Sequence, residues 1–136
     1  MKRSEAREQA FCVLFEQAVT GAPVQEILQA ASEARDLVLN SFAEAEAFGV
    51  EEHAREIDQV IERHLKGWSM RRLSKVTLAL LRLAVYEMLF VEDIPDSVSI
   101  NEAVELAKKY GGRDDAPYLN GVLAGVLRSR SPEDPA

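Results

Sequence analysis

Residues 94–123 read IPDSVSINEAVELAKKYGGRDDAPYLNGVL, and this stretch contains the start and stop signals of a helix. Pro95 marks a turn before the helix. Ser99, with a glutamate three residues later, fits a capping box, and Ser97 is an alternative start. The pair at 111–112 is Gly-Gly, which ends helices because glycine adopts backbone conformations that other residues avoid. The stretch therefore predicts an amphipathic helix that closes in a tight loop.

A second helix follows that loop. Asp114 or Asp115 is expected to cap it, and Pro117 suits its first turn. Its second turn carries Asn120 and Gly121. Helix interiors disfavour both residue types, and glycine costs about 1 kcal/mol there relative to alanine. Packing or function must therefore explain why these two residues occur there. We expect the explanation to be structural, with glycine allowing a neighbouring helix to approach closely.

Hydrophobic periodicity predicts six helices in all. Positions 33–48 are less regular and are expected to break near Asn40, with Gly49 as a helix C-cap. The helix ending at Phe90 is apolar on most of its faces, so other helices are expected to pack around it. The expected helices cover residues 4–18, 24–48, 50–68, 70 or 73–90, 97 or 99–110 and 115–127.

The composition is that of an ordinary soluble globular protein, because 47% of the 136 residues are apolar and 29% are charged. Few glycines and prolines favour an all-α protein over a sandwich of short strands. The single cysteine, Cys12, is expected to be a small core residue. Residues 1–9 are polar and do not resemble a signal peptide, and the apolar stretch 78–91 is interrupted by charges. A cytoplasmic protein without a membrane span is predicted.

Catalytic signatures are missing from the sequence. It contains no nucleophile elbow, no phosphate-binding glycine loop and no zinc-protease motif. The two histidines, His53 and His64, are eleven residues apart on one expected helix, which separates them by roughly 16 Å along its axis. They are too far apart to share a metal ion. We therefore predict no enzyme activity, no metal site and no cofactor.

Charge is unevenly distributed over the chain, whose formal net charge is −7. Residues 26–62 contain ten acids and two bases, whereas residues 63–82 contain six bases and no acid. Two interpretations are open: solvated helix faces, or a basic surface assembled from separate segments to hold RNA phosphates. Further bases lie at the N-terminus and around residue 110, namely Lys2, Arg3, Arg7, Lys108, Lys109 and Arg113.

Two tyrosines flank the predicted loop. Tyr110 ends one helix and Tyr118 opens the next. They could lie close together and stack on the bases of single-stranded RNA, since aromatic rings and basic side chains are the usual means of holding it. The alternative is that each ring is half-buried with its hydroxyl in water.

The C-terminal stretch closely resembles the signature of the NusB family of bacterial transcription antitermination factors. The N-terminal helix resembles the family's R-x-x-A-R-x-x-A start at residues 3–10, and WSMRRLSKVTLALLRLAVYEM, residues 68–88, resembles its central helix. The matching positions of the signature are Ile100, Asn101, Glu102, Ala103, Glu105, Leu106, Ala107, Lys108, Gly111, Asn120 and Gly121.

This resemblance implies a fold and a function. The fold would be an all-α, NusB-like bundle of about six to seven helices in two packed three-helix halves. The halves would cover about residues 1–68 and 69–130 of a single domain, and 131–136 would form a flexible tail. The function would be to bind the boxA element of nascent ribosomal transcripts as single-stranded RNA. The protein would do so with NusE, a small-subunit ribosomal protein, in the antitermination complex of RNA polymerase.

The resemblance, read together with the basic residues, also implies binding residues. Three positions depart from the family's usual pattern: Ser4 and Glu5 where arginine is common, Pro117 where lysine is common, and Thr77-Leu78 where an acidic-basic pair is common. The first two bear on RNA affinity and the third on the NusE contact. The expected RNA-binding residues are Lys2, Arg3, Arg7, Lys108, Tyr110, Arg113, Asp114 and Tyr118, and the expected NusE-binding residues are Phe15, Thr77 and Glu87.

Two other functions fit the same resemblance. NusB-like domains also serve as RNA-binding modules of RNA methyltransferases. A NusB-fold protein with weak RNA binding could instead act only through protein contacts, as the diluted basic N-terminus suggests. Salt-dependent RNA binding would separate the latter from an antitermination factor. A homodimer in the free state is a further open possibility.

Overall fold

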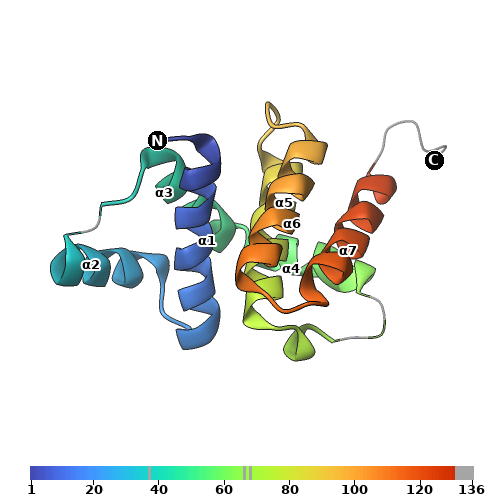
Figure 1. Cartoon of the computed structure of the whole chain (residues 1–136), viewed down its shortest axis with the longest axis horizontal. Helices are drawn as coiled ribbons and strands as arrows, with labels where there is room; N and C mark the ends of the chain where they lie inside the picture. The colour runs from blue at the N-terminus through green and yellow to red at the C-terminus, as the bar shows by residue number, and fades with distance from the viewer. Residues whose placement is uncertain (37, 66, 68, 131–136) are drawn as a thin grey trace.

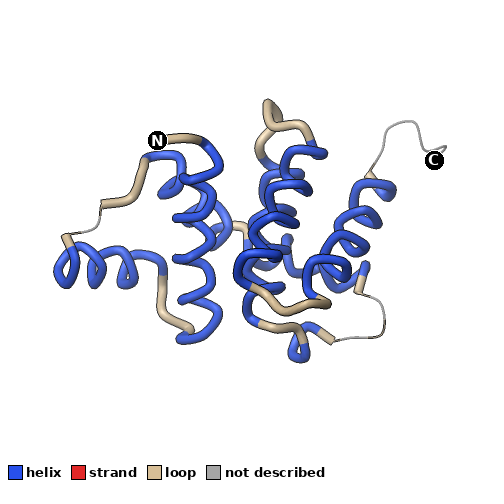
Figure 2. The backbone as a smooth tube through the Cα atoms, viewed as in Figure 1, coloured by secondary structure: helices blue, strands red, loops and turns tan. Residues whose placement is uncertain are grey.

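Helices account for most of the chain that the structure, a computed structural model, describes: residues 1–36, 38–65, 67 and 69–130. These ranges contain seven α-helices, one 3-10 turn and no strand (Figure 2). The elements are α1 (Arg3–Thr20), α2 (Val24–Arg35), α3 (Ser41–Glu52), α4 (Ala54–His64), η1 (Met70–Arg72), α5 (Lys75–Phe90), α6 (Asp96–Tyr110) and α7 (Asp115–Ser129). The predicted all-α class is confirmed, and seven helices agree with the six to seven that the family resemblance implies, although periodicity alone predicted six.

Some expectations fall outside the described residues. They are Trp68, the last apolar residue of the third expected helix, the base at Lys66 and the flexible tail at 131–136. The expected termination of that helix at Gly67 is wrong, because α4 ends at His64 and Leu65 is already extended. Within the described ranges, every helix is too short or too polar for a bilayer crossing. The division of the domain near residue 68 stays a prediction.

The region expected to form one irregular helix is two helices, α2 and α3. The side-chain oxygen of Asn40 accepts a hydrogen bond of 2.8 Å from the backbone N–H of Phe42 and so caps α3. The expected break near Asn40 is confirmed. The expected C-cap at Gly49 is wrong, because Gly49 lies inside α3. A Cβ atom there would lie 2.3 Å from Cζ of Tyr86 on α5, so glycine is required for the close approach of these helices.

α5 occupies the centre of the molecule, as predicted, and packs against α1, α3, α4, α6 and α7 (Figure 1). Ten of its sixteen residues are buried, so little of its surface remains for solvent. One apolar core joins these six helices. α2 is held by a smaller cluster with Val13 of α1 and Ala47 of α3. Cys12, expected in the core, is exposed instead, because it lines a hollow between α1 and α2.

The start of α6 differs from the prediction, and its end does not. α6 begins at Asp96, directly after Pro95. Ser99 lies inside the helix, where its buried hydroxyl donates a hydrogen bond of 2.7 Å to Glu87 of α5. The capping box expected at Ser99 is therefore wrong. α6 ends at Tyr110, before the two glycines, and α7 begins after a short loop, as expected.

Candidate nucleic-acid interface

A hollow of about 300 Å³ lies where α7 begins. Its walls come from η1, the start of α5, and the loop and first turn of α7, which are far apart in the sequence. They meet because the chain turns back after α6, so that α7 packs against both α6 and α5 (Figure 1). The lining residues are Arg72, Leu73, Ser74, Thr77, Asp114, Asp115 and Tyr118.

Asp115 fixes the shape of the loop beside this hollow. Its Oδ1 accepts hydrogen bonds from Thr77 Oγ1 at 3.0 Å and from Ser74 Oγ at 3.3 Å. Its Oδ2 accepts one from the backbone N–H of Gly112 at 2.7 Å. Hydrogen bonds to an ionised acceptor are stronger than neutral ones. Asp115 therefore ties the loop and α7 to the first turn of α5.

Three of the expected binding residues lie in or next to this hollow. Asp114 and half-buried Tyr118 line it, and exposed Arg113 precedes them in the loop. Arg72 of η1 also lines it and was not predicted as a site residue. The acid-free stretch 63–82 was the only signal in the sequence, and it does not distinguish Arg72 from the other bases. The hollow thus combines an aromatic ring, a base and an acid.

Tyr110 has different neighbours from Tyr118. Its ring centroid lies 5.0 Å from that of Phe11 on α1, and its hydroxyl donates a hydrogen bond to Glu8. Nζ of Lys109 lies 2.6 Å from the same carboxylate. These two hydrogen bonds lower the pKa of Glu8, and the hydrogen bond to Glu8 raises the pKa of Tyr110. Tyr110 therefore fastens the end of α6 to α1, and 41% of it remains exposed.

Exposed bases lie at the start of α1 and near the end of α6. Lys2 and Arg3 are exposed at the start of α1, and the Arg3 guanidinium lies 3.9 Å from the ring centroid of Phe42. This cation–π contact holds the arginine while leaving its edge open to solvent. Lys108 is exposed near the end of α6 and pairs with Glu105 at 3.2 Å. A surface ion pair of this kind contributes little and can be exchanged for a phosphate.

Arg7 is buried, unlike Lys2 and Arg3. It is 4% exposed, and its Nε donates to Glu87 Oε2 at 2.7 Å. A longer contact of 3.4 Å joins its Nη1 to Glu102. The guanidinium is thus committed to α5 and α6, and a contact with RNA would require these ion pairs to open.

Glu46 of α3 faces the same buried cluster. Both of its carboxyl oxygens are buried without a hydrogen-bond donor among the described residues. Burial, together with the neighbouring Glu87 carboxylate, raises the pKa of Glu46 to about 10. Glu46 is therefore protonated at neutral pH, and its own hydroxyl can donate toward Glu87. The cluster joins four helices and offers no free charge to a ligand.

The residues expected to contact NusE do not form one surface. Thr77 and Glu87 are 2% and 1% exposed, and each is bonded to a charged residue of another helix. Phe15 is half-buried, with its ring centroid 6.0 Å from that of Phe11. Of the three, only Phe15 reaches the surface in this conformation.

Asn120 and Gly121 lie at the surface of α7. Asn120 is exposed, and a Cβ atom on Gly121 would meet no other atom within 4 Å. The expected close approach of a neighbouring helix at Gly121 is therefore wrong. Gly125, one turn later, is the glycine that packs closely, because a Cβ atom there would lie 3.2 Å from the ring of His64. No packing within the described chain explains Gly121.

Among the described residues, His, Cys, Asp and Glu side chains do not gather into a group of three that could hold a metal ion. Both histidines lie in other surroundings. His53 stacks on Phe90 with 3.9 Å between ring centroids. Nδ1 of His64 lies 2.9 Å from the carbonyl oxygen of Val60. Each imidazole is thus accounted for by local packing or hydrogen bonding.

Known proteins resemble this chain over nearly its whole length. The sequence model of the NusB family matches residues 4–128. The transcription antitermination protein NusB of Bacillus licheniformis is 43% identical over 126 residues, which cover 93% of this chain and 96% of that protein. The structure of T. maritima NusB has a TM-score of 0.84 and 33% identity, covering 98% of this chain and 96% of that one. A chain from the crystal structure of the antitermination factors NusB and NusE in complex with dsRNA has a TM-score of 0.82 and 28% identity, covering 93% and 96%.

Proposed function

This chain belongs to the NusB family, and from that premise we propose that it is a transcription antitermination factor that binds boxA RNA of nascent ribosomal transcripts together with NusE. The relatives' names support the antitermination role. The structural relative crystallised with NusE and dsRNA supports these two classes of partner. Action within the antitermination complex of RNA polymerase is part of the same proposal.

The hollow at the start of α7 is the observation that carries the RNA-binding proposal. Tyr118, Arg72 and Asp114 surround it, on a loop that Asp115 holds in place. Single-stranded RNA is held by stacking of bases on aromatic rings and by basic side chains on phosphates. Tyr118 would stack on a base, Arg72 would contact a phosphate, and Asp114 would accept a hydrogen bond from a base edge.

The RNA path would run from this hollow across α6 to the start of α1. Contacts between Glu8 and Lys109 place α1 beside the end of α6. Lys108 and Arg113 lie at one end of this path, and Lys2 and Arg3 lie at the other. A path along exposed bases from three segments fits a binding mode in which phosphate contacts supply most of the affinity.

Three of the expected binding residues act indirectly in this proposal. Arg7 and Glu87 hold α1 against α5 and α6 through their buried ion pair. Thr77 holds Asp115 and thereby the loop. They would position the binding surface without touching RNA or NusE. Phe15 keeps its direct role in NusE binding, because it is partly exposed.

Fluorescence anisotropy with labelled boxA RNA, with and without NusE, tests the proposal. Tyr118→Ala should weaken RNA binding by roughly 1–3 kcal/mol. Tyr118→Phe should keep most of the affinity, because stacking needs the ring and not the hydroxyl. NusE binding and thermal unfolding of both variants should stay close to those of the unmodified chain. An alanine variant with normal RNA affinity would exclude the stacking role.

The two alternative functions have less support. A module of an RNA methyltransferase would be expected to match longer proteins, yet the match covers 96% of the Bacillus protein and leaves no room there for a catalytic domain. A role in protein contacts alone predicts RNA binding that is weak and insensitive to Tyr118. The same anisotropy experiment therefore distinguishes it from the antitermination factor.

A further inference from the structure

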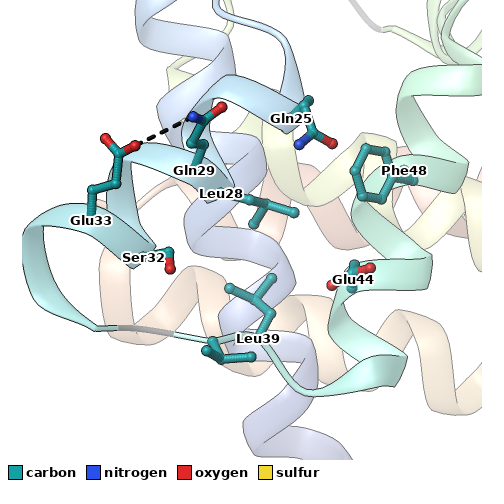
Figure 3. Close-up of a pocket in the computed structure, with 9 residues that line it drawn as sticks. Gln25, Leu28, Gln29, Ser32, Glu33, Leu39, Glu44 and Phe48 are labelled. Atoms are coloured by element: carbon teal, nitrogen blue, oxygen red, sulfur yellow. Dashed lines mark hydrogen bonds between the residues drawn. The ribbon is translucent and has the colours of Figure 1, made fainter.

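An apolar groove of about 420 Å³ separates α2 from α3. Figure 3 shows Leu28 and Leu39 on one side of the open space and Phe48 of α3 on the other. Val38 also lines the groove and is 78% exposed, more than any other large hydrophobic side chain of the described residues; the start methionine, at 72%, is next. Apolar side chains gathered along an open groove indicate a binding surface.

α2 buries one of its faces fully, and Leu28, Leu39 and Phe48 are only partly buried at the border of the groove. Val24 and Ile27 attach α2 to the small apolar cluster beside α1, and Ala31 is also buried. Leu28 follows Ile27 by one position, which is about 100° around the helix, and so it faces α3 instead. Figure 1 shows α2 at the edge of the molecule.

The charged residues that line the groove are acidic. Glu33 of α2 and Glu44 of α3 line it and are exposed, and its nine lining residues include no lysine or arginine. Leu39 also lines the hollow of about 450 Å³ between α1 and α2. Glutamates dominate the charge there too, with Glu5, Glu8 and Glu16 against the single basic side chain of Arg35. Both sides of α2 thus combine apolar walls with negative rims.

We propose that the α2–α3 groove binds a basic amphipathic helix of a partner protein. Apolar side chains at i, i+3 and i+4 of that helix would contact Leu28, Leu39 and Phe48, as in other helix-in-groove complexes. Its lysines or arginines would lie opposite Glu33 and Glu44, which sets orientation and speeds association. The groove lies at the opposite end of the molecule from α7 (Figure 1), so this proposal is independent of RNA binding.

A peptide of about four helical turns, with leucines at i, i+3, i+4 and i+7 and lysines elsewhere, serves as the probe. Anisotropy with the full chain should show saturable binding that weakens as salt is added. The same peptide with glutamates in place of lysines should bind much more weakly. Amide chemical shifts should move for residues around Leu28, Leu39 and Phe48. Equal binding of the two peptides, or shifts confined to other helices, would overturn the proposal.

Surface variants distinguish the groove from general attraction to an acidic protein. Val38→Ser should weaken peptide binding by about tenfold, and the double variant Glu33→Lys, Glu44→Lys should remove most of the salt dependence. Val98→Ser and Glu92→Lys change the same residue types at exposed positions away from the groove and should stay within about twofold of the unmodified chain. Equal losses in the control variants would overturn the proposal. A change in self-association caused by Val38→Ser, seen by sedimentation, would make a second copy the occupant and would also overturn it.

Discussion

Gly121 occupies a partly exposed position in a helix interior where a larger residue would fit. A Cβ atom there would meet nothing within 4 Å, so glycine lowers the stability of α7 by about 1 kcal/mol without any packing gain. The proposed RNA path begins at Tyr118, which lies one turn earlier on the same helix. Close approach of the RNA backbone to α7 would explain why a side chain is missing there.

Gly121→Ala should therefore have opposite effects on stability and on binding. The thermal unfolding temperature should rise by a few °C, and RNA affinity should fall. Gly125→Ala is the matched control on the same helix, because its Cβ atom would lie 3.2 Å from the His64 ring and should give no such stabilisation. Calorimetry and RNA anisotropy on both variants measure the two effects. Unchanged RNA affinity for Gly121→Ala would show that Gly121 does not serve to let the RNA backbone approach α7.

Glu46 makes stability depend on pH in a direction that is unusual for a carboxylic acid. Its pKa rises from an ordinary 4.5 to about 10 in the folded protein. Between these values the folded chain binds one more proton at this site than the unfolded chain. The free energy of unfolding should therefore decrease as pH rises through this window. Below the ordinary pKa the contribution of Glu46 is fully present.

Glu46→Gln should remove this dependence while keeping a donor toward Glu87. Urea unfolding near pH 5 should show similar stabilities for the two proteins, and near pH 9 the glutamine variant should be the more stable one. Glu44→Gln, on the exposed side of α3, is the control and should leave the pH profile unchanged. Parallel profiles for the glutamine variant and the unmodified chain would contradict the buried, protonated state of Glu46.

At the scale of the element, α1 contains basic residues with two different roles. Lys2 and Arg3 are exposed at its start, whereas Arg7 is buried against Glu87. Removing Lys2 and Arg3 together should flatten the slope of log affinity for RNA against log salt by about 1.4, since each phosphate contact with a single strand contributes about 0.7. Stability should barely change. An unchanged slope would mean that α1 does not touch RNA.

Arg7→Ala provides the contrast within the same helix. It would leave Glu87 buried without its cation, which typically destabilises a protein by about 3–5 kcal/mol. Chemical unfolding should show this loss directly. RNA binding measured below the unfolding transition should keep the salt slope of the unmodified chain, because Arg7 makes no phosphate contact in the proposed arrangement. A reduced salt slope of RNA affinity without a loss of stability would instead show that Arg7 contacts RNA.

At the scale of the whole molecule, the two proposed surfaces lie at opposite ends. α2 and α3 border the acidic groove, and α7 begins at the hollow with Tyr118 (Figure 1). The central helix α5 separates them and is buried on most sides. We expect the two surfaces to be independent, since substitutions this far apart rarely influence one another.

Paired measurements on surface variants test this independence. Val38→Ser should leave RNA affinity within about twofold of the unmodified chain, and Tyr118→Ala should do the same for affinity of the leucine-lysine peptide. Each variant is thus the control for the other. Loss of both affinities in either variant would indicate a shared surface or partial unfolding, which circular dichroism would reveal.

Sequence alone determined the features that depend on neighbours in the chain. Apolar periodicity indicated the helices and the central position of α5, and the two glycines indicated where α6 ends. The signature of the C-terminal stretch indicated the family, since it depends on residue types at fixed spacing. These predictions succeeded because the underlying interactions act within a few residues of each other.

Only the tertiary structure decided which side chains are available for binding. Arg7 is buried by Glu87, which lies eighty residues later in the sequence. Asp115 uses Thr77 to hold its loop, and the open space at Gly121 depends on how α7 packs against α5 and α6. The sequence pattern around a basic or polar residue is the same whether that residue is exposed to solvent or buried in an ion pair. Its exposure is set by helices that meet only when the chain has folded, because burial and pairing depend on distance in space and not on distance along the chain.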